Sequence, residues 1–453
     1  MQHPQAYQLA EQIEDLIASG RDDDLESLLY QFSPVDIAIA LRELSESDRN
    51  RVFSILELHE QAAVLEEADD ETTGDLLEGV ATEELSRIID AMPPDAGADA
   101  IAFLTEEDAG RVLELMPDEE SDELEELLKY PEDSAGGIMS PEFVAVREDI
   151  TAAQAMEVVR AAGVTPETLF YVYVVDDDDG LAGVVDLREL ILADPEALLS
   201  SFCVRDVAKV TPDVDQEEVV RLSHKYDLLA LPVVDANDRL LGTVTVDDVI
   251  DVLQREHTED ITRLAGTDAA DLMSKSSIKV AGIRLPWLAI CLVGSLGSAA
   301  IIRFFEVTLR DVIALVAFIP IITATGGNSG LQSSTVAVRG LALGLVQPFG
   351  VGRLFMREIR TALLMGLACG LIIGLLVVVW VNDRPEVGLI VGLSLFAAIT
   401  WAATVGSLVP LLFHRLGLDP AVASGPLVTT ANDVFGLVIY FAIATALLHA
   451  WGR

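Results

Sequence analysis

Basic residues are scarce in this chain. Its 453 residues include 29 Lys and Arg against 74 Asp and Glu, which gives a formal net charge of −45. Such a charge repels the phosphate backbone, so we expect no nucleic-acid partner. Cations are the favoured partners. The alternative is that the acidity serves only solubility or adaptation to salt.

Cysteine is also rare, and its three positions, Cys203, Cys291 and Cys369, are far apart. They lack the spacing of metal ligands and imply no disulfide framework. A secretory signal is lacking as well, because Met1 to Pro4 are polar and no basic-then-apolar segment follows directly. We therefore expect the amino-terminal half to stay in the cytoplasm.

The high net charge is typical of a soluble protein, whereas the positive mean hydropathy is typical of a membrane protein. The two values are compatible only if they belong to different parts of the chain. The mean hydropathy is +0.41 despite the charge of −45. Residues 1–280 hold 67 of the acids and 19 of the basic residues, whereas residues 281–453 hold 7 and 10. An acidic, water-soluble half thus precedes an apolar half, which excludes a single soluble globule.

The first region is repetitive. Helix-start signals such as Ser33, Ser45 and Thr105 each precede an acid by three residues, as in a capping box. No helix this short buries its apolar stripe alone, so we predict a stacked, superhelical all-α domain over residues 1–132. Apolar residues recur every 12 positions at Phe32, Leu44, Leu56, Ala68, Val80, Met92, Leu104 and Met116.

The second region repeats a β-α-β-β-α pattern, with copies over residues 133–199 and 200–262. In the first copy, the β-branched run 169–175 ends in four consecutive aspartates, Asp176 to Asp179, which mark a turn. The two copies resemble a pair of CBS domains, a regulatory α/β module whose cleft holds adenine nucleotides in many relatives. The second copy matches the ribose-contacting pattern of that family with Gly242, Thr243, Thr245 and Asp248.

The first copy departs from that pattern, since it carries Gly183, Asp186 and Glu189 at the matching positions. The resemblance therefore implies one site for ATP or another adenine nucleotide rather than two.

Acids cluster on the last helix of the second copy and on the helix before it. Acids three or four positions apart share a helical face, and their repulsion is relieved when a cation bridges them. Hard oxygen ligands suit Mg²⁺ or Ca²⁺, and a solvated acidic surface is the alternative. These acids are Asp247, Asp248, Asp251, Glu256, Glu259 and Asp260 on the last helix, with Asp215, Glu217, Glu218 and Asp227 around the earlier one.

A connecting helix over 263–283 is expected to lead into a transmembrane domain over 284–453. Its basic residues Arg263, Lys275, Lys279 and Arg284 favour anionic lipid headgroups. A span needs ~20 apolar residues, so the apolar stretches predict five helices. These stretches cover about 286–305, 311–342, 359–381, 386–413 and 421–450.

The loop charges predict the orientation. Arg339, Arg353, Arg357 and Arg360 surround the second loop and Arg415 marks the fourth. Because cytoplasmic loops are enriched in cations, the soluble half is expected inside and the carboxyl terminus outside a cell or inner membrane.

Polar residues interrupt two of the membrane segments. In the second, a glycine-rich run after Pro320 contains Asn328 and Gln332; helix packing through small residues explains the glycines but not these amides. In the fifth, Asp433 lies near mid-helix, after Thr429. An acid at this depth costs ~2.5–3.5 kcal/mol on insertion scales and usually marks an ion path.

The order of these parts, with Pro-x5-Gly-Gly-Asn in the second span and Asn-Asp-x-x-Gly in the fifth, resembles the MgtE family of Mg²⁺ channels. The resemblance implies a homodimer with a pore between the subunits, where Asp433 matches the acid that holds a largely hydrated Mg²⁺. Asn328 lies in the matching second-helix motif, with Gln332 and Thr429 nearby as further pore residues. It also assigns cytosolic Mg²⁺ sensing to Asp95, Asp215, Glu217, Asp227, Asp248, Asp251, Glu256, Glu259 and Asp260.

At one expected sensing position this chain has Ala63, which puts the number of sensor ions in question.

The predicted fold class is a multidomain α-helical membrane protein: an acidic all-α superhelical repeat, an α/β CBS pair, a connecting helix and five transmembrane helices. The predicted function is a Mg²⁺ channel that admits Mg²⁺ down its gradient and closes when cytosolic Mg²⁺ binds the sensor acids. A CBS-regulated carrier of another cation or of an anion is the alternative, although Asp433 argues against an anion. A membrane-anchored enzyme is not expected, because no catalytic signature is visible.

Overall fold

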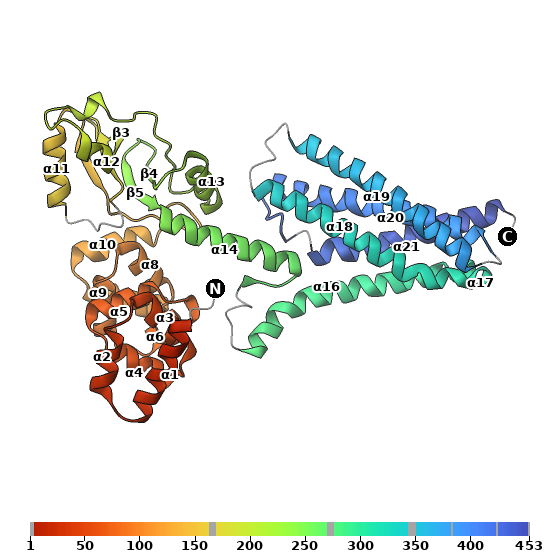
Figure 1. The fold of residues 1–453 in the computed structure, drawn as a ribbon, viewed down its shortest axis with the longest axis horizontal. Helices are drawn as coiled ribbons and strands as arrows, with labels where there is room; N and C mark the ends of the chain where they lie inside the picture. Colours follow the sequence, from red (N-terminus) through yellow and green to blue (C-terminus); the bar gives the residue numbers. More distant parts are fainter. Residues whose placement is uncertain are drawn as a thin grey trace. The chain divides into compact units, whose positions relative to one another are not determined.

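A computed structural model describes residues 4–162, 169–269, 276–342, 350–381, 384–422 and 425–451. The chain divides into two compact units, Met1–Leu253 and Gln254–Arg453. The first contains short helices and two small sheets, and the second contains long apolar helices that lie side by side (Figure 1).

The chain begins with short helices that stack upon one another, as the 12-residue spacing predicts. Predicted caps are present: the side chains of Ser33, Ser45 and Thr105 each accept a hydrogen bond from the backbone N–H three residues later. Each such bond satisfies a donor that the helix itself leaves unpaired. The helices are α1 (Pro4–Ala18), α2 (Asp22–Leu29), α3 (Pro34–Glu43), α4 (Glu46–Ile55), α5 (Leu58–Glu66), α6 (Asp70–Glu78), α7 (Thr82–Asp90), α8 (Pro94–Ala102), α9 (Glu106–Leu115) and α10 (Asp118–Leu127).

Two α/β copies follow. In the first, β1 (Val144–Arg147) pairs in parallel with β2 (Tyr171–Val175), which pairs antiparallel with β3 (Leu181–Asp186). In the second, β4 (Ala230–Val234) and β5 (Leu240–Thr245) form the antiparallel pair, and a single parallel bridge from Val210 to Val233 stands in place of the first strand. The accompanying helices are α11 (Ala152–Ala161), α12 (Leu187–Leu192), α13 (Gln216–Tyr226) and α14 (Val246–Ala265), with a short 3₁₀ turn, η1 (Leu199–Ser201).

The helical repeat and the second α/β copy share one hydrophobic core. Leu124 and Leu127 of α10 belong to the same buried cluster as Leu231 of β4 and Val244 of β5. The first α/β copy has a separate core, built around residues such as Val172. Burial of a common apolar surface therefore ties the helical repeat to the second copy.

Among its described residues, the second unit contains five helices long and apolar enough to cross a membrane. This confirms the predicted fold class. The five are α16 (Ser277–Phe304), α18 (Ile319–Ala342), α19 (Val351–Trp380), α20 (Glu386–Arg415) and α21 (Gly425–Ala450), with α17 (Glu306–Asp311) and the 3₁₀ segment η2 (Ile313–Phe318) between the first two.

Glycines let three of these helices come into close contact. A Cβ atom placed on Gly406 of α20 would lie 2.2 Å from the carbonyl oxygen of Gly330 of α18. A Cβ atom on Gly326 of α18 would lie 2.6 Å from Oδ1 of Asn432 on α21. Backbones that approach this closely gain packing energy that larger side chains would prevent. The buried glycines of α18 are thus explained by packing, and α18 stays helical through them.

The segment predicted as one connecting helix over 263–283 is divided differently. Helix α14 continues from the second α/β copy to Ala265 and is followed by Gly266, whose φ is +76°. Residues 270–275, which include the predicted headgroup contact Lys275, lie outside the described residues, and α16 begins at Ser277. The left-handed backbone at Gly266 favours glycine and ends α14.

Candidate functional site

One face of α18 carries polar side chains to the surface of the single chain. Asn328 and Gln332 are both exposed, and they lie four residues apart on the same side of the helix. The opposite side is buried: Gly326, Ser329, Gly330 and Ser333 lie there. Exposed amides on a membrane helix are costly against lipid, so this face needs water or another protein surface beside it.

Helix α21 places Asp433 and Thr429 on one face. Asp433 is half-buried, and within the described residues its carboxylate has no hydrogen bond or ion pair. Thr429 lies one turn earlier, and its hydroxyl donates to the carbonyl oxygens of Gly425 and Pro426, at 3.2 and 3.1 Å. An acid without a partner at this depth is free to bind a cation.

Asn432 holds α21 against α18. This side chain is only 2 % exposed, and its Nδ2 donates to the carbonyl oxygen of Thr323 over 3.0 Å. The contact fixes the rotation of α21 and thereby the direction in which the neighbouring Asp433 points. Its position directly before Asp433 is visible in the sequence, but its positioning role depends on the contact between the two helices.

In the first unit, Asp95 of the helical repeat lies near Asp248 of α14. One carboxylate oxygen of Asp95 is buried without a hydrogen-bond partner in the described part of the chain. Asp248 accepts a 2.6 Å hydrogen bond from the hydroxyl of Thr245. Burial raises the pKa of Asp95 to about 6. Burial likewise raises the pKa of Asp248 to about 7, and the charge of Asp95 adds to the rise.

The predicted nucleotide residues occupy β5 and the start of α14. Gly242 is required by packing, because a Cβ atom there would lie 2.7 Å from the carbonyl oxygen of Ser140. Thr243 and Thr245 are each 2 % exposed and lie on the same face of the strand. The Thr243 hydroxyl is buried and has no hydrogen-bond partner among the described residues.

The other predicted sensor acids of this unit lie apart from one another. Asp215 and Glu217 are at the start of α13, where Asp215 accepts a 2.8 Å hydrogen bond from the backbone N–H of Glu217. Asp227 follows the other end of this helix in a left-handed conformation, about 16 Å away at 1.5 Å per residue. Asp227 therefore cannot share one ion with Asp215 and Glu217 within a single chain.

Asp251 has a neighbour that the sequence alone did not identify. Desolvation raises the pKa of Glu67, and the charge of Asp251 adds to the rise. Glu67 follows Ala63 by one helical turn, so it brings a carboxylate to the region where the expected acid at position 63 is missing. Only the tertiary proximity of Glu67, which directly follows α5, to Asp251 of α14 identifies it.

The remaining predicted acids lie on the part of α14 that belongs to the second unit. Burial raises the pKa of Glu259 and that of Asp260, and the charge of Glu256 adds to the rise at Glu259. Arg263 forms ion pairs with both Glu259 and Asp419, the latter just before α21. Arg263 is therefore engaged by acids, and Lys279 is exposed; contact of either side chain with lipid headgroups stays a prediction.

The end of α14 also contacts the start of α21. A Cβ atom on Gly425 would lie 2.1 Å from the carbonyl oxygen of Leu264. A Cβ atom on Gly266 would lie 2.6 Å from the Pro426 ring. The helix that carries the acids thus directly contacts the helix that carries Asp433.

The acids do not form a complete metal cage in one chain. Across the described ranges, no group of three or more His, Cys, Asp or Glu side chains is placed to hold a metal ion. The described residues contain pairs of acids instead, such as Asp95 with Asp248. One carboxylate oxygen of Asp95 is buried without a hydrogen-bond partner among the described residues, and it suits a hard cation. Such pairs leave room for the water ligands that Mg²⁺ usually keeps.

The spans, the unpartnered membrane acid and the CBS-like unit define a membrane transporter of cations. Family models agree along the chain: a divalent cation transporter model matches residues 319–443, an MgtE intracellular N domain model matches 32–133, and a CBS domain model matches 135–196 and 199–255.

Whole-chain relatives establish the family. The chain is 35 % identical to a magnesium transporter MgtE of Bacillus subtilis over 435 residues, 96 % of each protein. It is 43 % identical to a magnesium transporter MgtE of Thermus thermophilus over 331 residues, 72 % of this chain and 73 % of the relative. The chain belongs to the MgtE family of magnesium transporters.

Two solved structures are similar to the soluble half. One is the soluble part of a magnesium transporter, 31 % identical, with a TM-score of 0.50 over 55 % of this chain and 99 % of that one. The other is the cytosolic domain of the Mg²⁺ channel MgtE in complex with ATP, 37 % identical, with a TM-score of 0.51 over 54 % and 99 %.

The pKa values of Asp95 and Asp248 predict how stability depends on pH without divalent ions. Both pKa values lie above those of the unfolded chain, so the folded protein binds more protons between about pH 4 and 7. The free energy of unfolding then increases as the pH falls through this range. We expect Asp248→Asn to raise the melting temperature of the full chain at pH 8 in Mg²⁺-free buffer and to flatten its increase toward pH 5.

Circular dichroism of the detergent-solubilised chain measures this effect. Asp247→Asn is the matched control, because Asp247 is the neighbouring acid and is exposed. Equal pH slopes for Asp248→Asn and Asp247→Asn would contradict the assignment.

Proposed function

We propose that two copies of this chain form a Mg²⁺-selective channel that admits Mg²⁺ into the cytoplasm down its electrochemical gradient. The observation that carries this proposal is the polar face of α18 and α21. Asn328 and Gln332 are exposed and Asp433 has no partner among the described residues, although all three lie on helices apolar enough to cross a membrane. A second copy that faces the first across water would satisfy all three.

The chemistry of this face suits a hydrated ion. Mg²⁺ gives up its water reluctantly, so amide and hydroxyl oxygens that contact its water shell, with one carboxylate from each subunit, provide selection without a full cage. Asn328, Gln332 and Thr429 are the neutral contacts in this proposal, and Asp433 is the charged one. An anion carrier would instead need cationic groups on this face.

The distribution of arginines supports the proposed orientation. Within the second unit, Arg339, Arg353, Arg357, Arg360 and Arg415 lie at the helix ends on the side where α14 packs, as the contact between Leu264 and Gly425 indicates. Cytoplasmic ends of membrane helices carry an excess of such residues. The soluble half is therefore cytoplasmic in this proposal, and the carboxyl terminus is outside.

Closure follows from the acids of the soluble half and α14. At low cytosolic Mg²⁺, close carboxylates such as Asp95 and Asp248 repel each other. At high Mg²⁺, ions bound between the sensor acids favour one arrangement of α14, whose end contacts the start of α21 through Leu264 and Gly425. Inhibition requires that Mg²⁺ bind the closed arrangement more tightly than the open one.

An adenine nucleotide at the second CBS copy is part of the same proposal. A relative's cytosolic domain was solved in complex with ATP. In this chain, Thr243 offers a buried hydroxyl without a partner among the described residues, and Thr245 orients Asp248 by a 2.6 Å hydrogen bond. These groups match what a ribose requires, namely hydroxyl and carboxylate partners.

The central test removes the membrane acid. We expect Asp433→Ala to reduce Mg²⁺ uptake into proteoliposomes, followed with an internal fluorescent indicator, to the level of empty vesicles, because no other acid replaces the lost charge on that helix face. Glu306→Gln is the control and should retain uptake. The protein should also have twice the single-chain mass of 48.7 kDa in native mass spectrometry. Uptake by Asp433→Ala at the unsubstituted rate would refute the pore assignment.

Closure is tested with the double variant Asp248→Asn, Asp251→Asn. Loss of both sensor charges should leave Mg²⁺ flux running at internal Mg²⁺ concentrations that stop the unsubstituted channel. Mg²⁺ flux is measured in vesicles that are loaded with increasing concentrations of Mg²⁺. Asp178→Asn, in an exposed turn of the first CBS copy, serves as the control. Unaltered inhibition in the double variant would count against these acids as sensors.

Nucleotide binding is tested by isothermal titration of ATP into the full chain. Thr243→Val removes the unpartnered hydroxyl while it conserves the volume of the side chain. We expect at least a tenfold loss of ATP affinity, in line with about 1.4 kcal/mol for a lost hydrogen bond. Ser200→Ala, in the 3₁₀ turn η1 outside β5 and α14, provides the control. Equal ATP affinity of both variants would show that the nucleotide does not contact Thr243.

A further inference from the structure

Four arginines line one cavity at the ends of α18 and α19. The cavity has a volume of about 980 Å³, and Arg339 of α18 lines it together with Arg353, Arg357 and Arg360 of α19. Val336, Met356 and Leu364 contribute apolar parts of its wall. We call these four arginines and their cavity the arginine pocket.

The positive charge of the arginine pocket exceeds the negative charge around it. Arg357 contacts Glu358 over 3.3 Å, and Glu358 also accepts a 3.1 Å hydrogen bond from the Ser333 hydroxyl. Arg339 lies near Asp260, whose pKa it lowers against the stronger effect of burial. Arg353 and Arg360 have no hydrogen bond or ion pair with any described residue. The pocket therefore offers donors to an anion.

The hydroxyl groups nearby do not compete for that anion. The Thr335 hydroxyl donates to the Leu331 carbonyl at 2.9 Å, and the Thr361 hydroxyl donates to the Arg357 carbonyl at 3.0 Å. Recognition would come from the guanidinium groups, whose planar arrays of N–H donors match the oxygens of a phosphate.

The location of the arginine pocket points to the membrane interface. Arg339 lies near the end of the span Ile313–Ala342, and Arg353 lies near the start of the span Gly352–Trp380. Long arginine side chains extend from such positions toward the headgroup layer while their stems stay in apolar surroundings. All four arginines are exposed in the single chain.

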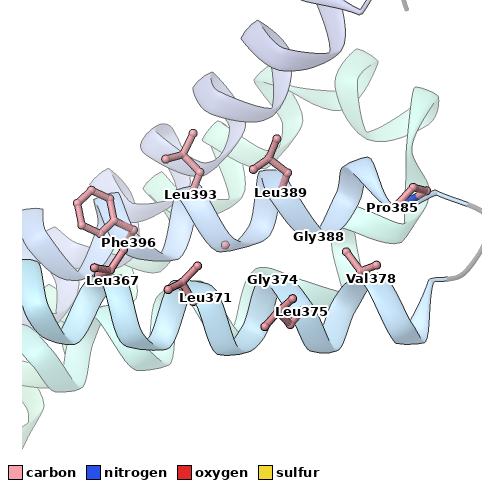
Figure 2. Close-up of a pocket in the computed structure, with 12 residues that line it drawn as sticks. Leu367, Leu371, Gly374, Leu375, Val378, Pro385, Gly388, Leu389, Leu393 and Phe396 are labelled. Atoms are coloured by element: carbon pink, nitrogen blue, oxygen red, sulfur yellow. The ribbon is translucent and has the colours of Figure 1, made fainter.

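An apolar track continues from the pocket along the same face of α19. Leu364, Leu367 and Leu371 follow Arg360 at steps of four, three and four residues, which keeps them on one side of the helix. From Leu367 onward the track enters an apolar groove of about 440 Å³ between α19 and α20, which Figure 2 shows with Leu371, Leu389 and Phe396 along it.

The length of this track matches one leaflet. From Arg360 to Leu371 the helix rises about 16 Å at 1.5 Å per residue. Half of a hydrocarbon core of ~30 Å is ~15 Å. A free phosphate or a nucleotide would use the arginines alone, whereas a phospholipid would use both the arginines and the apolar track.

We propose that the arginine pocket binds the phosphate of an anionic phospholipid, with one acyl chain along Leu364, Leu367 and Leu371. Charge complementarity selects the headgroup, and the apolar track on α19 that leads from the pocket to the groove selects a lipid over a soluble anion. The lipid belongs to the leaflet on the side of α14, whichever side of the membrane that is. The proposal is independent of the ion that the protein carries.

Binding is measured on the full chain in a neutral detergent by native mass spectrometry with added phosphatidylglycerol or phosphatidylcholine. We expect the triple variant Arg353→Gln, Arg357→Gln, Arg360→Gln to bind phosphatidylglycerol at least tenfold more weakly, because each basic group near an anionic surface contributes about fivefold. The triple Arg→Lys variant should keep most of the affinity. Arg415→Gln, an exposed arginine at the end of α20 outside the pocket, should bind like the unsubstituted chain.

Several outcomes would overturn the proposal. These are undiminished phosphatidylglycerol binding by the triple Gln variant, equal binding of phosphatidylcholine, or displacement of the lipid by millimolar inorganic phosphate, which would assign the pocket to a soluble anion. A photoactivatable phosphatidylglycerol with a diazirine in its acyl chain tests the unsubstituted protein directly. Its label should map to α19 between Arg360 and Leu371, and a label confined to other helices would refute the site.

Discussion

The backbone contact between Gly330 of α18 and Gly406 of α20 is the constraint on which the membrane unit depends. With a Cβ on Gly406 only 2.2 Å from a carbonyl oxygen, no side chain fits between these helices. Once this side of α18 is buried against α20 and α21, its other side must face outward. The exposure of Asn328 and Gln332 is therefore a consequence of glycine packing on the opposite face. The same contact leaves the outer face of α18 available for a partner.

Helix α14 carries predicted sensor acids and also contacts the membrane helix α21. Helix α14 begins in the second CBS copy and ends against the start of α21, where Gly425 accommodates the Leu264 carbonyl and Arg263 pairs with Asp419. In the proposed channel, a helix that carries Asp248 near one end and contacts the Asp433 helix at the other would transmit a displacement, because packed helices move as bodies rather than deform. The proposed function connects ion binding at carboxylates to ion passage through the membrane in this way.

Much of the architecture was predictable because it depends on local signals. The caps at Ser33, Ser45 and Thr105, the alternating strands and the long apolar runs each act within a few residues, and the structure confirms the helices, the paired α/β copies and the five spans. The connecting segment was predicted less well. Its helix ends at Ala265 because Gly266 adopts a left-handed backbone, and that position alone did not distinguish a helix end from a tolerated glycine.

The amino-acid sequence alone identified the candidate functional residues: the isolated Asp433, the amides Asn328 and Gln332, and the excess of acid before the first span. It did so because a polar group in an apolar helix, or a run of like charges, is costly wherever the chain folds. The tertiary structure alone showed which acids are neighbours, namely Asp95 with Asp248 and Glu67 with Asp251, and which acids form ion pairs with Arg263. The tertiary structure also places Arg339 and the arginines of α19 around one cavity. These pairings depend on distances between helices far apart in the chain, which packing sets and spacing along the sequence does not encode.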